Sequence, residues 1–175
     1  NPQFDPIKDF TYIINLTGYT FGLAVPANAP WKTIKDFVED AKRNPGKIDY
    51  ASYGAGSITQ LMAELFTRQA GINLVHVPYK GAAPAFQAVV GGQVGMTFLT
   101  YGLVKGQIDA GILRAIATSS SERLAALPNV PSIHEAGVEN FDASGWISCM
   151  LPSGTAKDIV VRLNDEIGKV VRSAD

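Results

Sequence analysis

The stretch Ile48–Gly71, IDYASYGAGSITQLMAELFTRQAG, constrains the fold most, because it predicts a strand, a glycine-rich corner and a helix in direct succession. Asp49–Tyr53 has the small and aromatic residues of a short buried strand, and the following Gly-Ala-Gly lets the backbone turn tightly. Ser57 and Gln60 form an S-x-x-Q capping pattern, which places the helix start at the corner. Apolar residues then recur at helical spacing, so one face of this helix is expected to be buried.

The glycine-rich corner is also the candidate ligand site. A helix that starts at the carboxyl end of a strand presents unpaired N–H groups and the positive end of its dipole at one point, which suits a carboxylate or a phosphate. The candidate residues are Tyr53, Gly54, Ala55, Gly56 and Ser57. A purely structural interpretation stays open, because sterics alone favour glycine at such corners and Ser57 can serve only as a helix cap. No G-x-x-x-x-G-K-[ST] motif is present, which disfavours a nucleoside triphosphate.

Composition narrows the range of partners. The 175 residues are 46% hydrophobic and 18% charged, which is enough apolar material for a folded core and suits one domain or two small lobes. The formal charge of −1 and the scattered lysines and arginines provide no basic surface for nucleic acid. A single cysteine, Cys149, and two distant histidines, His76 and His134, give neither an intrachain disulfide nor a local metal motif. We therefore expect no nucleic-acid partner, no metal and no cofactor.

Strands and helices alternate regularly between Phe21 and Thr118. Apolar runs, capping residues and glycine stops predict five strands with four intervening helices; the strands are 21–25, 49–53, 74–77, 94–100 and 113–118. Alternation at this spacing is typical of parallel strands joined by right-handed crossovers, with helices on both faces of the sheet. The sequence therefore predicts an α/β lobe with a mostly parallel sheet.

The regions on either side of this lobe contain too few elements to form a core of their own. Thr11–Leu16 reads as one strand and Ser144–Leu151 as another, and an amphipathic helix with Thr155 as its cap follows at 156–172. Two strands and one helix are fewer than a stable second sheet normally needs. Such an incomplete lobe leaves strand edges open, which favours self-association of the chain or pairing with another protein.

These elements suggest three segments. We expect residues 1–20 to be a remnant of a first lobe and its hinge, and residues 21–118 to be a complete ligand-binding lobe. Residues 119–175, which include a proline-containing crossing segment, are expected to return into the first lobe. The missing part of that lobe would precede Asn1.

Two further loops leave strand ends on the same side of the predicted sheet as the corner. Ligands of open parallel sheets bind beyond the carboxyl ends of the strands. These loops are the one with Tyr79, Lys80 and Gly81 and the strand end at Thr100. Lys80 would add a positive charge that favours a carboxylate. A solvated lysine after a turn, and packing of Tyr79 in the core, are the open structural alternatives.

No catalytic constellation accompanies these loops. No carboxylate pair, Ser-His-Asp order or Cys-His arrangement falls at the strand ends. Hydrogen-bond donors without a base favour binding over catalysis, so we expect neither enzyme activity nor a catalytic residue. An α/β enzyme that acts on a carboxylated or phosphorylated metabolite is the alternative, and it requires a general base within hydrogen-bond reach of the corner.

Several sequence blocks resemble a known family. PGKIDYASYGAGS followed by LMAELF, then VHVPYKGAAPA, GGQVGMTF, LRAIATSS-ERL-ALPNVPSIHEAG and W-x(4)-LPSGT are similar to the extracytoplasmic solute receptors of tripartite tricarboxylate transporters, the Bug or TctC-like family. The likeness extends over nearly the whole chain, and the blocks follow one another in the family's order.

This resemblance implies a function and a location. Receptors of this family are two-lobed periplasmic binding proteins that close around small carboxylates and deliver them to a membrane permease. By position, Tyr53–Ser57 matches a family loop that holds a ligand carboxylate, and Tyr79–Gly81 matches the Y-K-G loop beside it. Leu99 and Thr100 stand where the family commonly has an acidic residue, which favours a plain di- or tricarboxylate over an amino acid. The resemblance also implies that the family's other ligand loop would precede Asn1, so that the chain is a C-terminal fragment of a receptor.

Overall fold

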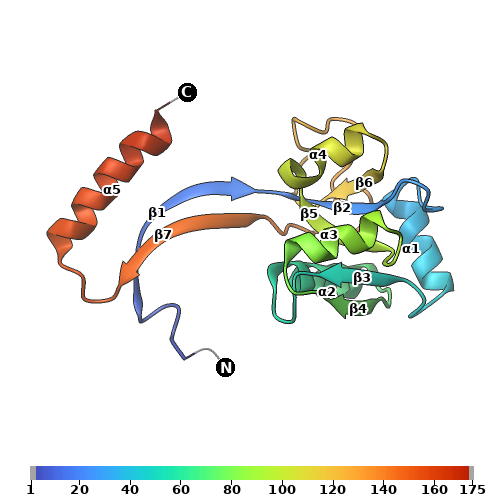
Figure 1. Ribbon diagram of the computed structural model, residues 1–175, viewed down its shortest axis with the longest axis horizontal. Helices are drawn as coiled ribbons and strands as arrows, with labels where there is room; N and C mark the ends of the chain where they lie inside the picture. Colours follow the sequence, from blue (N-terminus) through green and yellow to red (C-terminus); the bar gives the residue numbers. More distant parts are fainter. Residues whose placement is uncertain (1–2, 174–175) are drawn as a thin grey trace. The chain divides into compact units, whose positions relative to one another are not determined.

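The computed structural model describes residues 3–173, without the side chain of Val104. In chain order the elements are β1 (Phe10–Tyr19), β2 (Phe21–Pro26), α1 (Ile34–Arg43), β3 (Asp49–Ser52), α2 (Ile58–Ala70), β4 (Val75–Pro78), α3 (Ala82–Val90), β5 (Met96–Thr100), α4 (Tyr101–Asp109), β6 (Leu113–Thr118), β7 (Gly145–Pro152) and α5 (Lys157–Arg172) (Figure 1). The chain divides into two compact units. Unit 1 contains residues 1–19 and 145–175, and unit 2 contains residues 20–144. Residues 1–2 and 174–175, which the predicted terminal segments include, lie outside the described residues.

Unit 2 is built on a five-stranded sheet with the order β4-β3-β5-β2-β6. β3 is parallel to β4 and β5, whereas β2 is antiparallel to both of its neighbours, β5 and β6. Four of the five strands therefore share one direction, which confirms a mostly parallel sheet, but the expectation that β2 is also parallel is wrong. Alternation of strands and helices does not fix this direction, because β2 and β3 are not neighbours and α1 is no crossover between adjacent parallel strands.

The helices of unit 2 cover both faces of this sheet. On one face, the Phe66 ring of α2 lies 6.2 Å from the rings of Phe37 in α1 and Phe98 in β5. On the other face, Val89 of α3 packs with Leu99 of β5 in a second apolar cluster. Phe98 and Leu99 are adjacent in the chain, and successive strand side chains point to opposite faces. Both faces of the central strand are thus buried, as a doubly covered sheet requires.

Residues 119–144 belong to unit 2, and their expected role as a return crossing into a first lobe stays a prediction. Ile133 and Phe141 are fully buried, and the Phe141 ring lies 6.2 Å from that of Phe66. Thr118 also forms a parallel bridge with Ser132. Isolated apolar residues in an irregular, proline-containing segment follow no helix or strand period. The sequence pattern therefore does not predict that they are buried in the core. The relation of the two units to the lobes of a larger protein stays a prediction.

Unit 1 consists of one antiparallel strand pair and one helix. β1 pairs with β7 from Phe10↔Pro152 to Tyr19↔Gly145. Asn164 of α5 donates a hydrogen bond to the main-chain oxygen of Ile13 at 2.7 Å, which ties the helix to β1. The three elements predicted for the two ends of the chain are therefore confirmed, although α5 begins one residue later than expected, with Ala156 as its N-cap.

Candidate functional site

Four strands of unit 2 end at the same edge of the sheet. β3, β4, β5 and β6 run in one direction, so Ser52, Pro78, Thr100 and Thr118 mark their carboxyl ends. α2, α3 and α4 follow the first three of these strands, which gathers three helix N-termini at this edge. Eight of the nine residues proposed from the sequence lie in loops that leave this edge, and the ninth, Thr100, is the last residue of β5; the eight are Tyr53, Gly54, Ala55, Gly56, Ser57, Tyr79, Lys80 and Gly81.

Two main-chain hydrogen bonds hold the glycine-rich corner against the loop after β4. The N–H of Gly81 donates to the oxygen of Tyr53 at 3.1 Å, and the N–H of Tyr79 donates to the oxygen of Ser52 at 3.0 Å. Gly54 has a φ of 134°, and a Cβ at this position would lie 3.2 Å from the oxygen of Tyr79. Glycine tolerates both the conformation and the close approach. The two predicted ligand loops therefore lie side by side.

The amides of the corner itself are mostly occupied within the protein. The N–H of Gly54 donates to Ser52 Oγ at 3.2 Å, and the N–H of Ser57 donates to the oxygen of Gly54 at 3.2 Å. The N–H of Gly56 donates to Gln60 Oε1 at 2.6 Å. The amides of Gly54, Gly56 and Ser57 are therefore not free to bind an anion, while a ligand site at this corner stays a prediction. Because the Ser57 N–H is already bonded, the Gln60 side chain does not complete a capping box and reaches one residue further back, to Gly56.

The open donors lie in and next to the first turn of α2. The N–H groups of Ala55, Ile58 and Thr59 have no hydrogen-bond partner in the described part of the chain. Ser57 caps the helix by accepting the N–H of Gln60 at 3.4 Å, and its hydroxyl lies 3.2 Å from Thr59 Oγ1. Unpaired N–H groups at the start of a helix of thirteen residues suit an anion. The centre of the candidate site thus moves from the glycines to the helix start.

Lys80 and Thr100 flank these donors. Lys80 is exposed, and no ion pair within residues 3–173 involves it. Thr100 is the N-cap of α4, and its hydroxyl makes no capping hydrogen bond. An ammonium group and a hydroxyl in this state are available to ligand oxygens. Tyr79 differs from both, because it is partly buried against the apolar cluster beneath α3.

A serine and a histidine lie together beside the corner, and no sequence pattern indicates this pair. Ser52 Oγ is 2.6 Å from His76 Nε2, and the His76 ring stacks on Tyr50 with ring centroids 4.9 Å apart. Burial raises the pKa of Tyr50 far above its ordinary value, and the hydrogen bond to Glu64 adds to this effect. Ser52 is fully buried and also donates to the oxygen of Gly54, so its hydroxyl is no accessible nucleophile. Only the parallel register of β3 and β4 brings these residues together.

Sequence patterns also did not identify two buried hydroxyl groups at the carboxyl edge of the sheet, those of Ser119 and Thr118. Ser119 Oγ accepts the N–H of Phe21 at 3.1 Å and donates to the oxygen of Ala143 at 2.8 Å, so it joins the start of β2 to the end of unit 2. Thr118 Oγ1 is fully buried and has no hydrogen-bond partner among residues 3–173. Ser119 opens a run of three serines, a polar pattern that does not indicate a buried hydroxyl.

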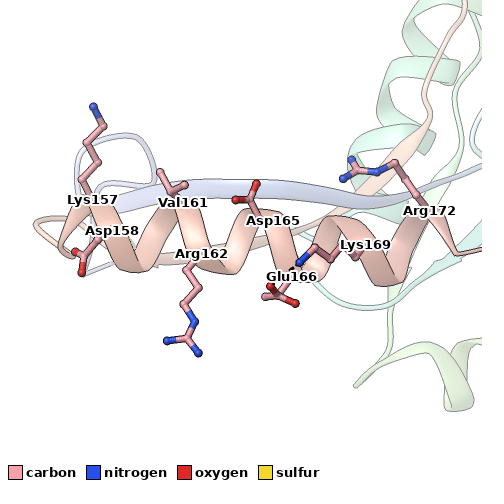
Figure 2. A pocket seen from close by; sticks show the side chains of 8 residues that line it. All are labelled: Lys157, Asp158, Val161, Arg162, Asp165, Glu166, Lys169 and Arg172. Carbon is pink, nitrogen blue, oxygen red and sulfur yellow. Dashed lines mark hydrogen bonds and ion pairs between the residues drawn. The ribbon is translucent and has the colours of Figure 1, made fainter.

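A hollow along α5 in unit 1 is a solvated helix surface. It measures about 700 Å³, and Figure 2 shows that the eight side chains lining it all come from this one helix. Seven of them are charged, with both signs represented, and Lys169 donates to Glu166 at 2.8 Å. Mixed charges along one helix face are typical of a solvent-exposed helix, so this hollow gives no specific ligand site.

Residues 3–173 contain no group of three or more His, Cys, Asp or Glu side chains that could hold a metal ion. No helix in this range combines the length and the apolar character needed to cross a bilayer.

The chain matches a family of known proteins. The family model for the tripartite tricarboxylate transporter family receptor, TctC, matches residues 1–174. The UPF0065 protein in the gbd 5′ region of Cupriavidus necator is 38% identical over 169 residues, which cover 97% of this chain and 51% of that protein. The chain therefore spans about half the length of the curated relatives it matches.

Solved structures show the same fold. An R. palustris protein solved with adipate is 30% identical, with a TM-score of 0.89 over 97% of this chain and 57% of that one. MatC from Rhodopseudomonas palustris with bound malate is 28% identical, with a TM-score of 0.88 over 98% of this chain and 58% of that one. These likenesses confirm the predicted α/β fold class.

Proposed function

Because the chain belongs to the family of tripartite tricarboxylate transporter receptors, we propose that the protein carrying it is an extracytoplasmic receptor that captures a small organic acid for a membrane permease. The family model describes a receptor and not an enzyme. The similar proteins solved with adipate and with malate each hold a small dicarboxylate. A di- or tricarboxylate is therefore the ligand class that these similarities support.

The main observation that supports this proposal is the position of the α2 start, where the glycine-rich corner lies against the loop after β4. The N–H groups of Ala55 and Ile58, two residues that are not buried, have no hydrogen-bond partner in the described part of the chain, and the helix dipole adds positive potential at this helix start. The exposed ammonium group of Lys80 lies in the adjoining loop. A carboxylate bound at this point would receive charge-assisted hydrogen bonds without any reacting side chain. The nine residues predicted from the sequence surround the ligand in this proposal, with Ile58 as an added donor.

Unit 2 is, in this proposal, a complete ligand-binding lobe, and unit 1 is part of a second lobe. Unit 2 has a buried core and the donor-bearing edge, whereas unit 1 has one strand pair and one helix. The relatives are about twice as long as the matched region, which leaves room for the rest of a second lobe. Hinge closure of the full-length receptor would then complete the ligand site.

Calorimetric titration of the full-length receptor with a panel of dicarboxylates tests this proposal. Gly56→Leu should abolish binding, because Gly56 has a φ of 76° and a leucine there strains the turn that positions α2. Gly111→Leu is the matched control, since Gly111 has a φ of 69° and equally open surroundings at the opposite edge of the sheet. Binding lost only in the Gly56 variant supports the site. Unchanged affinity in both variants rejects it.

A further inference from the structure

The sheet face that holds α3 and α4 has an apolar hollow at the same edge as the proposed carboxylate site. Its volume is about 270 Å³, and the residues lining it are Ala82, Ala83, Phe86, Leu99 and Leu103. The two alanines open α3, Leu99 lies at the end of β5, and Leu103 lies in the first turn of α4. The hollow is therefore placed between the starts of two helices.

This hollow suits a hydrocarbon group and not a charged one. No charged or hydrogen-bonding side chain lines it. Leu99 is only 1% exposed and belongs to the buried cluster beneath α3, whereas Leu103 is 63% exposed. An apolar surface of this kind favours a ligand group that displaces water from it. Whole ligand sites measure roughly 300–1,000 Å³, so a hollow of this size fits one part of a ligand.

The hollow adjoins the proposed carboxylate site through Gly81. Gly81 is the N-cap of α3, its N–H bonds to Tyr53 in the glycine-rich corner, and the next residue, Ala82, lines the hollow. Lys80 and the open N–H groups of α2 form the positive side of this surface, and the hollow forms its apolar side. A molecule that joins a carboxylate to a hydrocarbon chain is complementary to both sides.

We propose that this hollow holds the hydrocarbon chain of the bound acid, so that the receptor prefers a saturated dicarboxylate as long as adipate over a shorter or hydroxylated one. The inference rests on the proposed receptor function and adds its ligand preference. Each methylene group that moves from water onto an apolar surface strengthens binding about fourfold. A hydroxyl group in the hollow would lose its bonds to water without finding a partner in the lining.

Calorimetry of the full-length receptor with adipate and succinate tests this preference, since the two acids carry the same charge and differ in chain length. Adipate should bind about tenfold more tightly. In Ala83→Leu the new side chain fills the hollow, so adipate affinity should fall about tenfold while succinate affinity stays unchanged. Ala83 is exposed near the start of α3, where leucine is tolerated. Gln69→Leu, at an exposed position of α2 outside the hollow, is the matched control and should change neither affinity.

A second variant, Leu103→Ala, removes part of the apolar lining and should also weaken adipate alone. Equal affinity of the unmodified receptor for both acids, or adipate affinity unchanged in both variants, would overturn the preference and leave the receptor function standing. If another segment of the full-length protein fills the hollow, adipate will gain no affinity from it, and neither variant will change adipate affinity. Loss of both acids in Ala83→Leu also contradicts the preference, because the carboxylate itself would then sit in the hollow. If the unmodified receptor binds neither acid, the carboxylate receptor proposal fails together with the preference.

Discussion

Unit 1 and unit 2 contain the same kinds of elements but differ in what those elements bury. In unit 2, five phenylalanines are fully buried, namely Phe21, Phe37, Phe66, Phe98 and Phe141. In unit 1, Ile13 is the only buried hydrophobic side chain among the described residues. Its exposed large hydrophobic residues are Phe4, Ile7, Tyr12, Trp146, Ile147, Met150, Ile159, Val161, Val170 and Val171. An apolar period thus predicts an element, but not whether the same chain supplies the surface that covers it.

α5 illustrates this difference best. Its apolar residues Ile159, Leu163, Ile167 and Val170 recur at helical spacing, as in a helix that packs on a core. Yet Ile159 is 48% exposed and Val170 is 72% exposed. Soluble proteins seldom leave a contiguous apolar face of this kind uncovered. In the receptor proposed above, the remaining part of the second lobe would cover it.

Hydrogen exchange of this chain, followed by mass spectrometry, should show the largest contrast between the units. Amides of β2, β3 and β5 exchange only when the core opens, whereas the β1–β7 pair has little buried apolar surface to hold it. We expect peptides from β1 and β7 to exchange about 100-fold faster than those from β3 and β5. Equal protection would show that unit 1 is covered, and loss of this protection on dilution would identify another copy of the chain as the cover.

Truncation of an apolar side chain should lower the free energy of unfolding much more in unit 2 than in unit 1. Phe66 contacts the rings of Phe37, Phe98 and Phe141 in unit 2, so Phe66→Ala should lower the free energy of unfolding by about 3–5 kcal/mol. Val170→Ala in unit 1 removes an exposed side chain and should change it by less than about 0.5 kcal/mol. Urea denaturation followed by circular dichroism measures both values. Similar losses in the two variants would contradict the contrast.

Sequence patterns predicted the features of unit 2 that depend on neighbouring residues. The capping box of α1 is one example of such a local feature, since the hydroxyl of Thr33 and the carboxylate of Asp36, three residues apart, each accept the other residue's N–H. The start of α2 is another, because Ser57 caps the helix as predicted, and the helix ends at Gly71, the last residue of the predicted strand–corner–helix stretch. The loops of the candidate site could be named for the same reason, since each directly follows a strand.

Features that depend on distant partners could not be predicted in this way. The antiparallel direction of β2 is set by its pairing with β5 and β6, and not by its own residues. The burial of Phe141 depends on Phe66, and the occupied amide of Gly56 depends on which way the Gln60 side chain turns. Sequence therefore indicated where donors gather in the candidate site, but not which of them stay open.

Ser119→Ala tests a buried polar contact of unit 2. The buried Ser119 hydroxyl bonds to Phe21 and Ala143, and its removal leaves both main-chain groups without this partner. We expect a loss of about 1–3 kcal/mol in the free energy of unfolding, measured by urea denaturation. Ser120→Ala is the control, because Ser120 bonds only locally, to Glu122, at an exposed position. A loss in the control as large as in Ser119→Ala would show that the effect belongs to the loop and not to the buried hydroxyl.

The smallest change in the free energy of unfolding is expected on replacement of Thr118, whose hydroxyl is buried in unit 2 without a hydrogen-bond partner in the described chain. Thr118 and Thr97 are both fully buried in the sheet, but Thr97 Oγ1 donates to the oxygen of Ala51 at 2.9 Å while Thr118 Oγ1 has no such bond. Valine replaces threonine with little change of shape, so Thr97→Val should cost about 1 kcal/mol and Thr118→Val should stabilise unit 2 by up to about 1 kcal/mol. The urea midpoints of the two variants should therefore move in opposite directions. If both fall, the Thr118 hydroxyl has a partner at the edge where the ligand is proposed to bind, and this edge is more polar than its protein contacts alone suggest.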